Sequence, residues 1–207
     1  MSSSGLELER KIISKAQSLF DVVGVTSHPG GSLLILGLVT TPQRDLDDFA
    51  RGEVGDFRLR GFQIHALPKL EELLHLIREH GVAAELQGRF GYPQGKDLNL
   101  KQQAVKAGLG HWGKNSLVIH PGFGPWLRFM AMKVQTPLTP TGTGADNHQE
   151  NPLCEGCTAC IDACPVNVLE SYFLRDQNNC QASVSSMPQV GKLVTCDRCL
   201  VACPVGR

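Results

Sequence analysis

The residues with the clearest chemistry are eight cysteines, all of which lie after position 153 of the 207-residue chain. The segment "CEGCTACIDACP" places two residues between Cys154 and Cys157 and two more before Cys160, and Cys164 and Pro165 follow after another three. This spacing matches the bacterial ferredoxin pattern C-x2-C-x2-C-x3-C-P. A tight loop with two residues between ligands lets three thiolates converge on one face of an iron–sulfur cube. The segment therefore predicts a 4Fe–4S site.

A second set of cysteines completes two sites. Cys180 stands alone, Cys196 and Cys199 form another C-x2-C pair, and Cys203 is again followed by proline. In two-cluster ferredoxins the cysteine before the proline binds the other cluster. We therefore predict one 4Fe–4S cluster on Cys154, Cys157, Cys160 and Cys203, and a second on Cys164, Cys180, Cys196 and Cys199. The two centres would then be close neighbours, so that electrons can pass between them.

Two other uses of the cysteines compete with this interpretation. A pair of four-cysteine zinc sites would also use C-x2-C pairs, but zinc gives no reason for the x2, x2, x3 run or the two Cys-Pro steps. Disulfides are disfavoured, because the N-terminal "MSSSGLELERKIISKAQ" lacks the apolar core of a secretory signal and cytosolic thiols are kept reduced. We expect a cytoplasmic protein, and no apolar run predicts a membrane span.

The balance of charges argues against a surface that binds nucleic acid. The chain has 20 basic and 20 acidic residues, so it has no excess of positive charge for a phosphate backbone. Its 42% of hydrophobic and 19% of charged residues are ordinary for a soluble globular protein. Tight binding of RNA by this chain alone is therefore disfavoured.

Upstream of the cysteines, the apolar pattern predicts a layer of helices against a sheet. Helical spacing of apolar residues covers three segments, at 6–20, 68–81 and 98–108. Short apolar runs predict strands at 21–25, 33–39, 82–86, 116–120 and 127–134. A stretch rich in Pro, Gly and Thr has the composition of a connector. The predicted class is α+β, with an N-terminal α/β sheet domain at 1–140, a linker at 141–152 and a small bacterial dicluster-ferredoxin-type lobe at 153–207.

The stretch "AGLGHWGKNS" at 107–116 fits two phosphate-binding patterns. Gly108, Gly110 and Gly113 spell G-x-G-x-x-G, and the same stretch nearly spells G-x-x-x-x-G-K-[ST], with Asn115 in the last position. A dinucleotide fingerprint needs a strand, a glycine loop and then a helix, because the pyrophosphate binds at the helix N-terminus. Here a predicted helix ends at Gly108 and a strand follows, so nucleotide binding is disfavoured.

The run "AVKAGLGHWGKNSLVIHPGFGPWLRF", followed by the cysteine lobe, is similar to the epoxyqueuosine reductase family and its relatives among the corrinoid-dependent reductive dehalogenases. The resemblance covers roughly positions 95–204 and rests on A-G-L-G-x-x-G-K-N, the G-x-W turn at Gly124–Trp126 and all eight cysteines. It implies a short family member, which we expect to lack the helical-repeat tail of full-length members. Because that tail helps to hold tRNA, we expect a small-molecule substrate, and tRNA is a doubtful one.

The resemblance implies an iron–sulfur reductase in which two 4Fe–4S clusters relay single electrons to a pocket on the α/β domain. That pocket would take a substrate or a corrinoid, which makes cobalamin a candidate cofactor. Its lining would include Gly108, Gly110, His111, Lys114 and Asn115. Longer members place a catalytic aspartate upstream of the glycine element, where the nearest acid here is Asp97. We expect an external single-electron donor such as ferredoxin or flavodoxin. The alternative is a non-catalytic ferredoxin-like carrier or a subunit of a larger redox complex.

Overall fold

The computed structural model of the chain describes residues 3–51, 57–90, 98–144, 151–180, 192–193 and 196–206. The chain divides into two compact units, each built from three segments. Unit 1 comprises Met1–Val39, Gln63–Leu109 and Arg128–Asp146, and unit 2 comprises Thr40–Phe62, Gly110–Leu127 and Asn147–Arg207. The units therefore alternate along the chain. The division into consecutive domains at 1–140, 141–152 and 153–207 stays a prediction.

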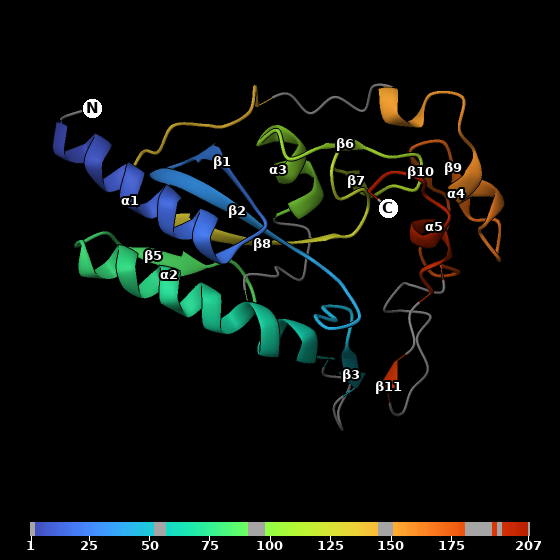
Figure 1. Cartoon of the computed structure of the whole chain (residues 1–207), viewed down its shortest axis with the longest axis horizontal. Coiled ribbons are helices and arrows are strands. Elements are labelled where there is room, and N and C mark those ends of the chain that lie inside the picture. The colour runs from blue at the N-terminus through green and yellow to red at the C-terminus, as the bar shows by residue number, and fades with distance from the viewer. Residues whose placement is uncertain are drawn as a thin grey trace. The chain divides into compact units, whose positions relative to one another are not determined.

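Unit 1 contains a four-stranded sheet (Figure 1) whose strand order is β1 (Val22–His28), β2 (Gly31–Val39), β8 (Leu127–Val134) and β5 (Ala84–Leu86). β1 pairs antiparallel with β2, and β5 pairs antiparallel with β8. The turn between β1 and β2 consists of Pro29 and Gly30, and the positive φ of 78° at Gly30 suits the second central position of a type II turn. The strands predicted at 21–25, 33–39, 82–86 and 127–134 are confirmed as sheet strands.

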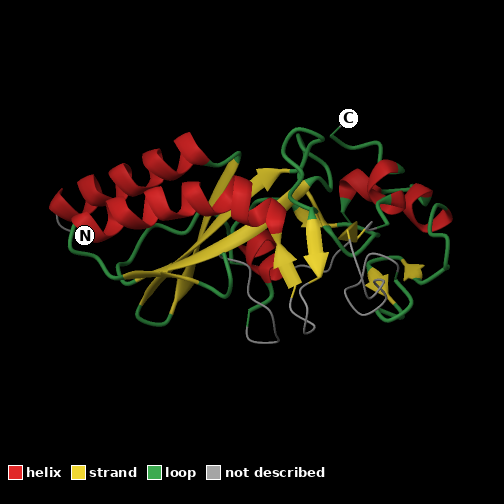
Figure 2. Ribbon diagram, turned by 90° about the horizontal axis from the view of Figure 1, so that it is seen from below, coloured by secondary structure: helices red, strands yellow, loops and turns green. Residues whose placement is uncertain are grey.

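Three helices cover this sheet, as the periodicity predicts. The helices α1 (Ser3–Leu19) and α2 (Leu67–Glu79) lie side by side along the sheet (Figure 1 and Figure 2), and α3 (Leu100–Lys106) packs on β1 and β2. On α3, Gln103 Oε1 accepts a hydrogen bond of 2.9 Å from Thr26 Oγ1 of β1. β2 is buried at seven consecutive positions, because both of its faces are covered.

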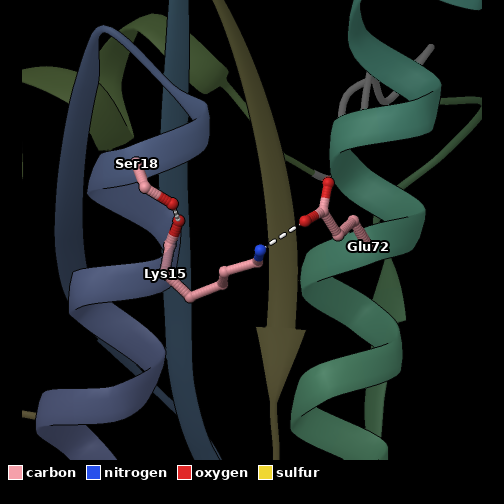
Figure 3. Close-up of polar contacts among 3 residues, drawn as sticks. All are labelled: Lys15, Ser18 and Glu72. Atoms are coloured by element: carbon pink, nitrogen blue, oxygen red, sulfur yellow. Dashed lines mark hydrogen bonds and ion pairs between the residues drawn. The ribbon is translucent and has the colours of Figure 1, made fainter.

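The helix pair α1 and α2 is held by apolar contact and by one exposed ion pair. Ile12 on α1 and Leu73 on α2 are fully buried. Lys15 Nζ donates to a carboxylate oxygen of Glu72, and Ser18 Oγ donates to the Lys15 carbonyl at 2.7 Å (Figure 3). Because an exposed pair contributes only about 0–1 kcal/mol, the buried aliphatic side chains account for most of the stability of this pairing.

Unit 2 is assembled from short elements. It has a three-stranded sheet in the order β11 (Lys192–Leu193), β3 (Phe49–Arg51) and β4 (Phe57–Leu59), and two small strand pairs: β6 (His111–Trp112) with β7 (Val118–Ile119), and β9 (Leu169–Glu170) with β10 (Phe173–Leu174). Its helical turns are η2 (Pro152–Cys154), α4 (Ala159–Asp162) and α5 (Arg198–Val201). A π-helical turn, η1 (Phe62–Ala66), leads into α2. The strand predicted at 116–120 is thus shorter than expected.

The mixed helix and sheet class that the sequence predicts is confirmed. None of the helices in the described ranges is both long and apolar enough to cross a lipid bilayer.

Candidate functional site

The cysteines lie on two similar loop and helix segments of unit 2. Cys154 ends η2, the chain reverses at Gly156 with a positive φ of 64°, and Cys160 lies on α4. The amide of Cys157 donates to the carbonyl of Cys154 at 3.2 Å, which closes this loop. α5 carries Cys199 in the same way. None of the eight cysteines is used in a disulfide.

The thiols assigned to the first cluster act on one another electrostatically. The pKa of Cys160 is raised to about 11, first by burial and then by the charges of Cys154, Cys157 and Cys203. Three of the four residues are 8–9% exposed, namely Cys154, Cys160 and Cys203. Thiols in this arrangement favour the protonated form unless a positive charge joins them. An iron–sulfur cluster supplies such a charge, and in binding it each thiol loses its proton.

The second set of thiols is also gathered in one place. Burial raises the pKa of Cys199 to about 12, and the charges of Cys160, Cys196 and Cys180 add to this effect. Cys164 lies in a small apolar cluster that Cys180 and Cys199 pack against. Because Cys160 acts on Cys199, the two sets are neighbours.

Cys164 has a different environment from the other buried cysteines. Burial raises the pKa of its thiol, but backbone N–H groups of the following turn lower the pKa by more, so the net shift is downward. These donors belong to Val168, Val166, Leu169 and Asn167. The Cys-Pro turn therefore surrounds this sulfur with amide hydrogens, a feature that stabilises a thiolate.

Among the described residues, no three His, Cys, Asp or Glu side chains converge closely enough to be ligands of one metal ion. A cubane cluster sets a different requirement, because each of its four cysteines binds a separate iron. The assignment of the eight cysteines to two clusters stays a prediction.

The glycine element follows the C-terminal end of a helix. Gly108 has a positive φ of 76°, and its amide donates to the Val105 carbonyl at 2.9 Å, which ends α3. The hairpin of β6 and β7 comes next. The order of helix and then strand is thus confirmed, and the helix end at this element presents carbonyl oxygens, which repel a phosphate. A Cβ at Gly110 would lie 2.6 Å from the carbonyl oxygen of Ile119, so this glycine allows the hairpin to close.

The polar residues of the glycine element make contacts of their own within unit 2. Lys114 Nζ donates to the Cys157 carbonyl at 3.1 Å, and the Lys114 carbonyl accepts from the amide of Tyr172 at 3.3 Å. Asn115 is 5% exposed, and its Oδ1 accepts from the Leu117 amide at 3.1 Å. His111 is exposed on β6. The element therefore braces the first cysteine loop through Lys114.

The contacts described so far do not test the predicted roles of the pocket residues or of the catalytic acid. Gly108 belongs to unit 1, whereas Gly110, His111, Lys114 and Asn115 belong to unit 2. Asp97, the candidate catalytic acid, lies outside the described residues. The roles of all six residues in binding or catalysis stay predictions.

The G-x-W turn supports the second cysteine segment. Gly124 has a positive φ of 54°, and a Cβ there would collide with the carbonyl oxygen of Val205. Val205 in turn packs on a small buried cluster that contains Cys154 and Cys203. The glycine of this motif thus lets the segment after Cys203 approach closely.

Sequence reasoning missed two residues next to the first cysteine loop. Asn151 is fully buried and caps η2, and its backbone N–H donates to Tyr172 Oη at 2.9 Å. The Asn-Pro step before the cysteine run is a turn signal that could have identified Asn151. Tyr172 had no such signal, because its contact with Asn151 depends on how the loop folds back.

Comparison with known proteins agrees with the resemblance. No protein-family model matches the chain. Epoxyqueuosine reductase of Cyclobacterium marinum is 29% identical over 186 residues, which cover 80% of this chain and 55% of that protein. The enzyme of the same name from Synechocystis is 28% identical over 186 residues and is matched over 62% of its length. The chain thus spans about half to three fifths of these relatives.

Solved structures show the same fold. Epoxyqueuosine reductase from Bacillus subtilis matches 98% of this chain and 66% of its own, with a TM-score of 0.70 and 16% identity. A catabolic reductive dehalogenase in complex with 3-bromo-4-hydroxybenzoic acid matches 95% of this chain and 31% of its own, with a TM-score of 0.66 and 15% identity. The resemblance drawn from the glycine element and the cysteines is confirmed: the chain is similar in sequence and fold to epoxyqueuosine reductases, and in fold to a reductive dehalogenase.

Proposed function

We propose that the chain is an iron–sulfur reductase of the epoxyqueuosine reductase kind and holds two 4Fe–4S clusters. The observation that carries the proposal is that three cysteines, Cys154, Cys157 and Cys203, gather around Cys160. Another three, Cys160, Cys180 and Cys196, gather around Cys199. The proposed ligands are Cys154, Cys157, Cys160 and Cys203 for one cluster and Cys164, Cys180, Cys196 and Cys199 for the other. Similarity to enzymes named epoxyqueuosine reductase supports the reaction class.

The donor chemistry of the two sets fits the proposed clusters. When bound, 4Fe–4S clusters supply one-electron transfer at potentials that the protein environment sets. Each set offers four cysteine sulfurs, which are the ligands that a 4Fe–4S cluster requires. Each set is also partly shielded from water. Lys114 places an ammonium group at the Cys157 carbonyl and so offsets the negative charge that four thiolates bring together.

We propose that the glycine element contributes to a substrate or corrinoid pocket. His111 and Lys114 are its polar groups that are not fully buried, and they would orient the bound molecule. Asp97 is the proposed proton donor, by analogy with the upstream aspartate of the family. A catalytic loop named for an aspartate is part of the solved Bacillus subtilis enzyme, which supports this choice.

The proposed substrate is epoxyqueuosine within tRNA. A solved epoxyqueuosine reductase that matches 97% of this chain, with a TM-score of 0.67, was crystallised with an epoxyqueuosine-modified tRNA stem loop. That observation favours tRNA against the earlier expectation from balanced charge. Assays therefore compare the modified stem loop with the free epoxyqueuosine nucleoside.

Metal analysis of the whole chain tests the cofactor part of the proposal. The protein is reconstituted anaerobically with iron and sulfide, with and without cobalamin, and examined by visible and EPR spectroscopy. We expect about eight irons per chain and retention of the corrinoid on gel filtration. Two zinc ions and no iron would overturn the proposal.

Turnover tests the catalytic part. With reduced ferredoxin or flavodoxin as donor, the loaded protein should convert epoxyqueuosine to queuosine, and Asp97→Asn should reduce the rate about 100-fold or more. Asp176→Asn is the matched control, because that exposed carboxylate caps the turn at 176–179. Reversible reduction without turnover or corrinoid retention would instead identify an electron carrier.

A further inference from the structure

Asn151 is a fully buried side chain directly before the first cysteine loop. It is 0% exposed, and three of its four polar groups have partners. Its backbone N–H donates to Tyr172 Oη at 2.9 Å, and its backbone carbonyl accepts from the Cys154 N–H at 2.7 Å. Its side-chain Oδ1 accepts from the Leu153 N–H at 2.9 Å. The residue is therefore held at several points.

The side-chain Nδ2 of Asn151 has no hydrogen-bond partner within the described part of the chain. The orientation of the Asn151 side-chain amide is assigned from this contact: the Leu153 backbone N–H can only donate, so the side-chain atom that faces it must be the oxygen, Oδ1. A buried donor without a partner costs about 1–3 kcal/mol, and native proteins rarely leave one without a reason. The geometry thus calls for an acceptor at Nδ2.

The surroundings of Asn151 indicate what this acceptor is. Asn151 caps η2, whose last residue is Cys154. Cys154 lies in a buried cluster with Ile119 and Cys203, and its charge reaches Cys160. The loop that Asn151 caps therefore carries cysteine sulfurs that we assign to one cluster. Thiolate and sulfide sulfurs of an iron–sulfur cluster accept hydrogen bonds, and those bonds help to set its potential.

We infer that Asn151 is a positioning residue for the cluster on Cys154, Cys157, Cys160 and Cys203, and that its Nδ2 donates a hydrogen bond to a sulfur of that cluster. This inference rests on the proposed function. A hydrogen bond to sulfur stabilises the reduced state, which carries one more negative charge. Asn151 therefore raises the reduction potential of this cluster and leaves that of the other unchanged.

Two variants of the full-length reconstituted protein test the inference. Asn151→Asp keeps the oxygen that caps η2, removes the donor and adds a charge, whereas Asn151→Ser keeps a capping oxygen without adding a charge. The matched control is Asn99→Asp, because Asn99 caps α3 in the same way, with its Oδ1 accepting from the Gln102 amide at 3.2 Å. Iron content and EPR-monitored redox titration are measured for each protein.

We expect both Asn151 variants to lower the midpoint potential of one cluster, with the larger shift for Asp, and Asn99→Asp to lower neither. Unchanged potentials in both variants, with about eight irons bound, would overturn the inference and leave the proposed function standing. A shift in Asp alone would also overturn it, because added charge would then be the cause. Wild-type protein without iron would overturn the proposed function itself.

A measurement on the wild type covers the case in which the variants do not fold. Protein labelled with 15N in asparagine side chains is reduced by one electron and examined by pulsed EPR. We expect a weak 15N coupling to one cluster. The absence of any such coupling would overturn the inference.

Discussion

Units 1 and 2 bury different chemistry. In unit 1, α1 has 17 residues and β2 has nine, and their inward faces are aliphatic. Among the described elements that lie wholly in unit 2, none exceeds four residues, and four of the buried residues of this unit are cysteines. Elements this short cannot cover a large apolar core, so a unit of this kind needs cross-links. Hydrophobic burial therefore stabilises unit 1, and we predict that the proposed clusters, when bound, stabilise unit 2.

The largest effect should come from removing a cluster ligand. Cys203→Ser should lose about four of about eight irons, because one whole cluster depends on this thiol. Limited proteolysis should then cut unit 2 while the helices and sheet of unit 1 stay protected. If the variant, or fully metal-free protein, resists protease as well as the loaded protein does, unit 2 does not depend on metal.

The second effect belongs to unit 1. Leu36 of β2 is 0% exposed, so Leu36→Ala should lower the free energy of unfolding by about 2–5 kcal/mol in a urea titration. Iron content should stay at the wild-type value. Leu6→Ala is the control, because Leu6 is 44% exposed and should change stability by less than about 0.5 kcal/mol. Loss of iron in the Leu36 variant would contradict the separation of the two units.

A glycine substitution tests how tightly unit 2 is assembled. Gly124→Ala should cost about 2–4 kcal/mol, because Ala would be strained at a φ of 54° and its Cβ would push on the Val205 carbonyl. Gly30→Ala has the same backbone strain at a φ of 78° but meets no atom within 4 Å, so about 1 kcal/mol is expected. Thermal unfolding of the loaded proteins measures both. Equal losses would mean that the Val205 contact is unimportant.

The stability of unit 2 should depend on pH through one histidine, His120. Burial lowers the pKa of His120, whose Nδ1 accepts from the amides of Gly122 and Phe123 at 3.0 and 3.2 Å. The folded state therefore resists a proton that the unfolded state takes up near pH 6.5, and stability should fall as the pH drops from about 7.5 to 5.5. His120→Asn, which offers an oxygen acceptor and does not titrate, should flatten this dependence in urea titrations. A steeper dependence in the variant would contradict it.

The smallest effect is expected at the surface of unit 1. Lys15→Met removes the ion pair with Glu72 (Figure 3) and should change the free energy of unfolding by about 0–1 kcal/mol. The difference from wild type should shrink further at 1 M salt, because salt screens exposed charges. A loss above about 2 kcal/mol would show that the pair matters more than the buried aliphatic contacts of α1 and α2.

Much of unit 1 could be predicted from the sequence, because its long elements have regular apolar spacing. Leu70, Leu73 and Ile77 recur with the helical period and are all buried on α2. Unit 2 was harder to predict, because its two- to four-residue elements are too short for any period to be read. There, turn chemistry and contacts between distant segments decide the backbone. Lys114, for example, finds its partner at Cys157.

The sequence by itself determined the number and spacing of the thiols, and spacing is local: a C-x2-C loop brings its two sulfurs together wherever it lies. It also determined the order of helix and strand around the glycine element, which argues against a phosphate loop. Only the tertiary structure decided that Gly124 must lack a side chain beneath Val205, and that Asn151 is buried with a side-chain donor that has no partner in the described part of the chain. The physical reason is that long-range packing, not local propensity, sets which groups lose contact with water.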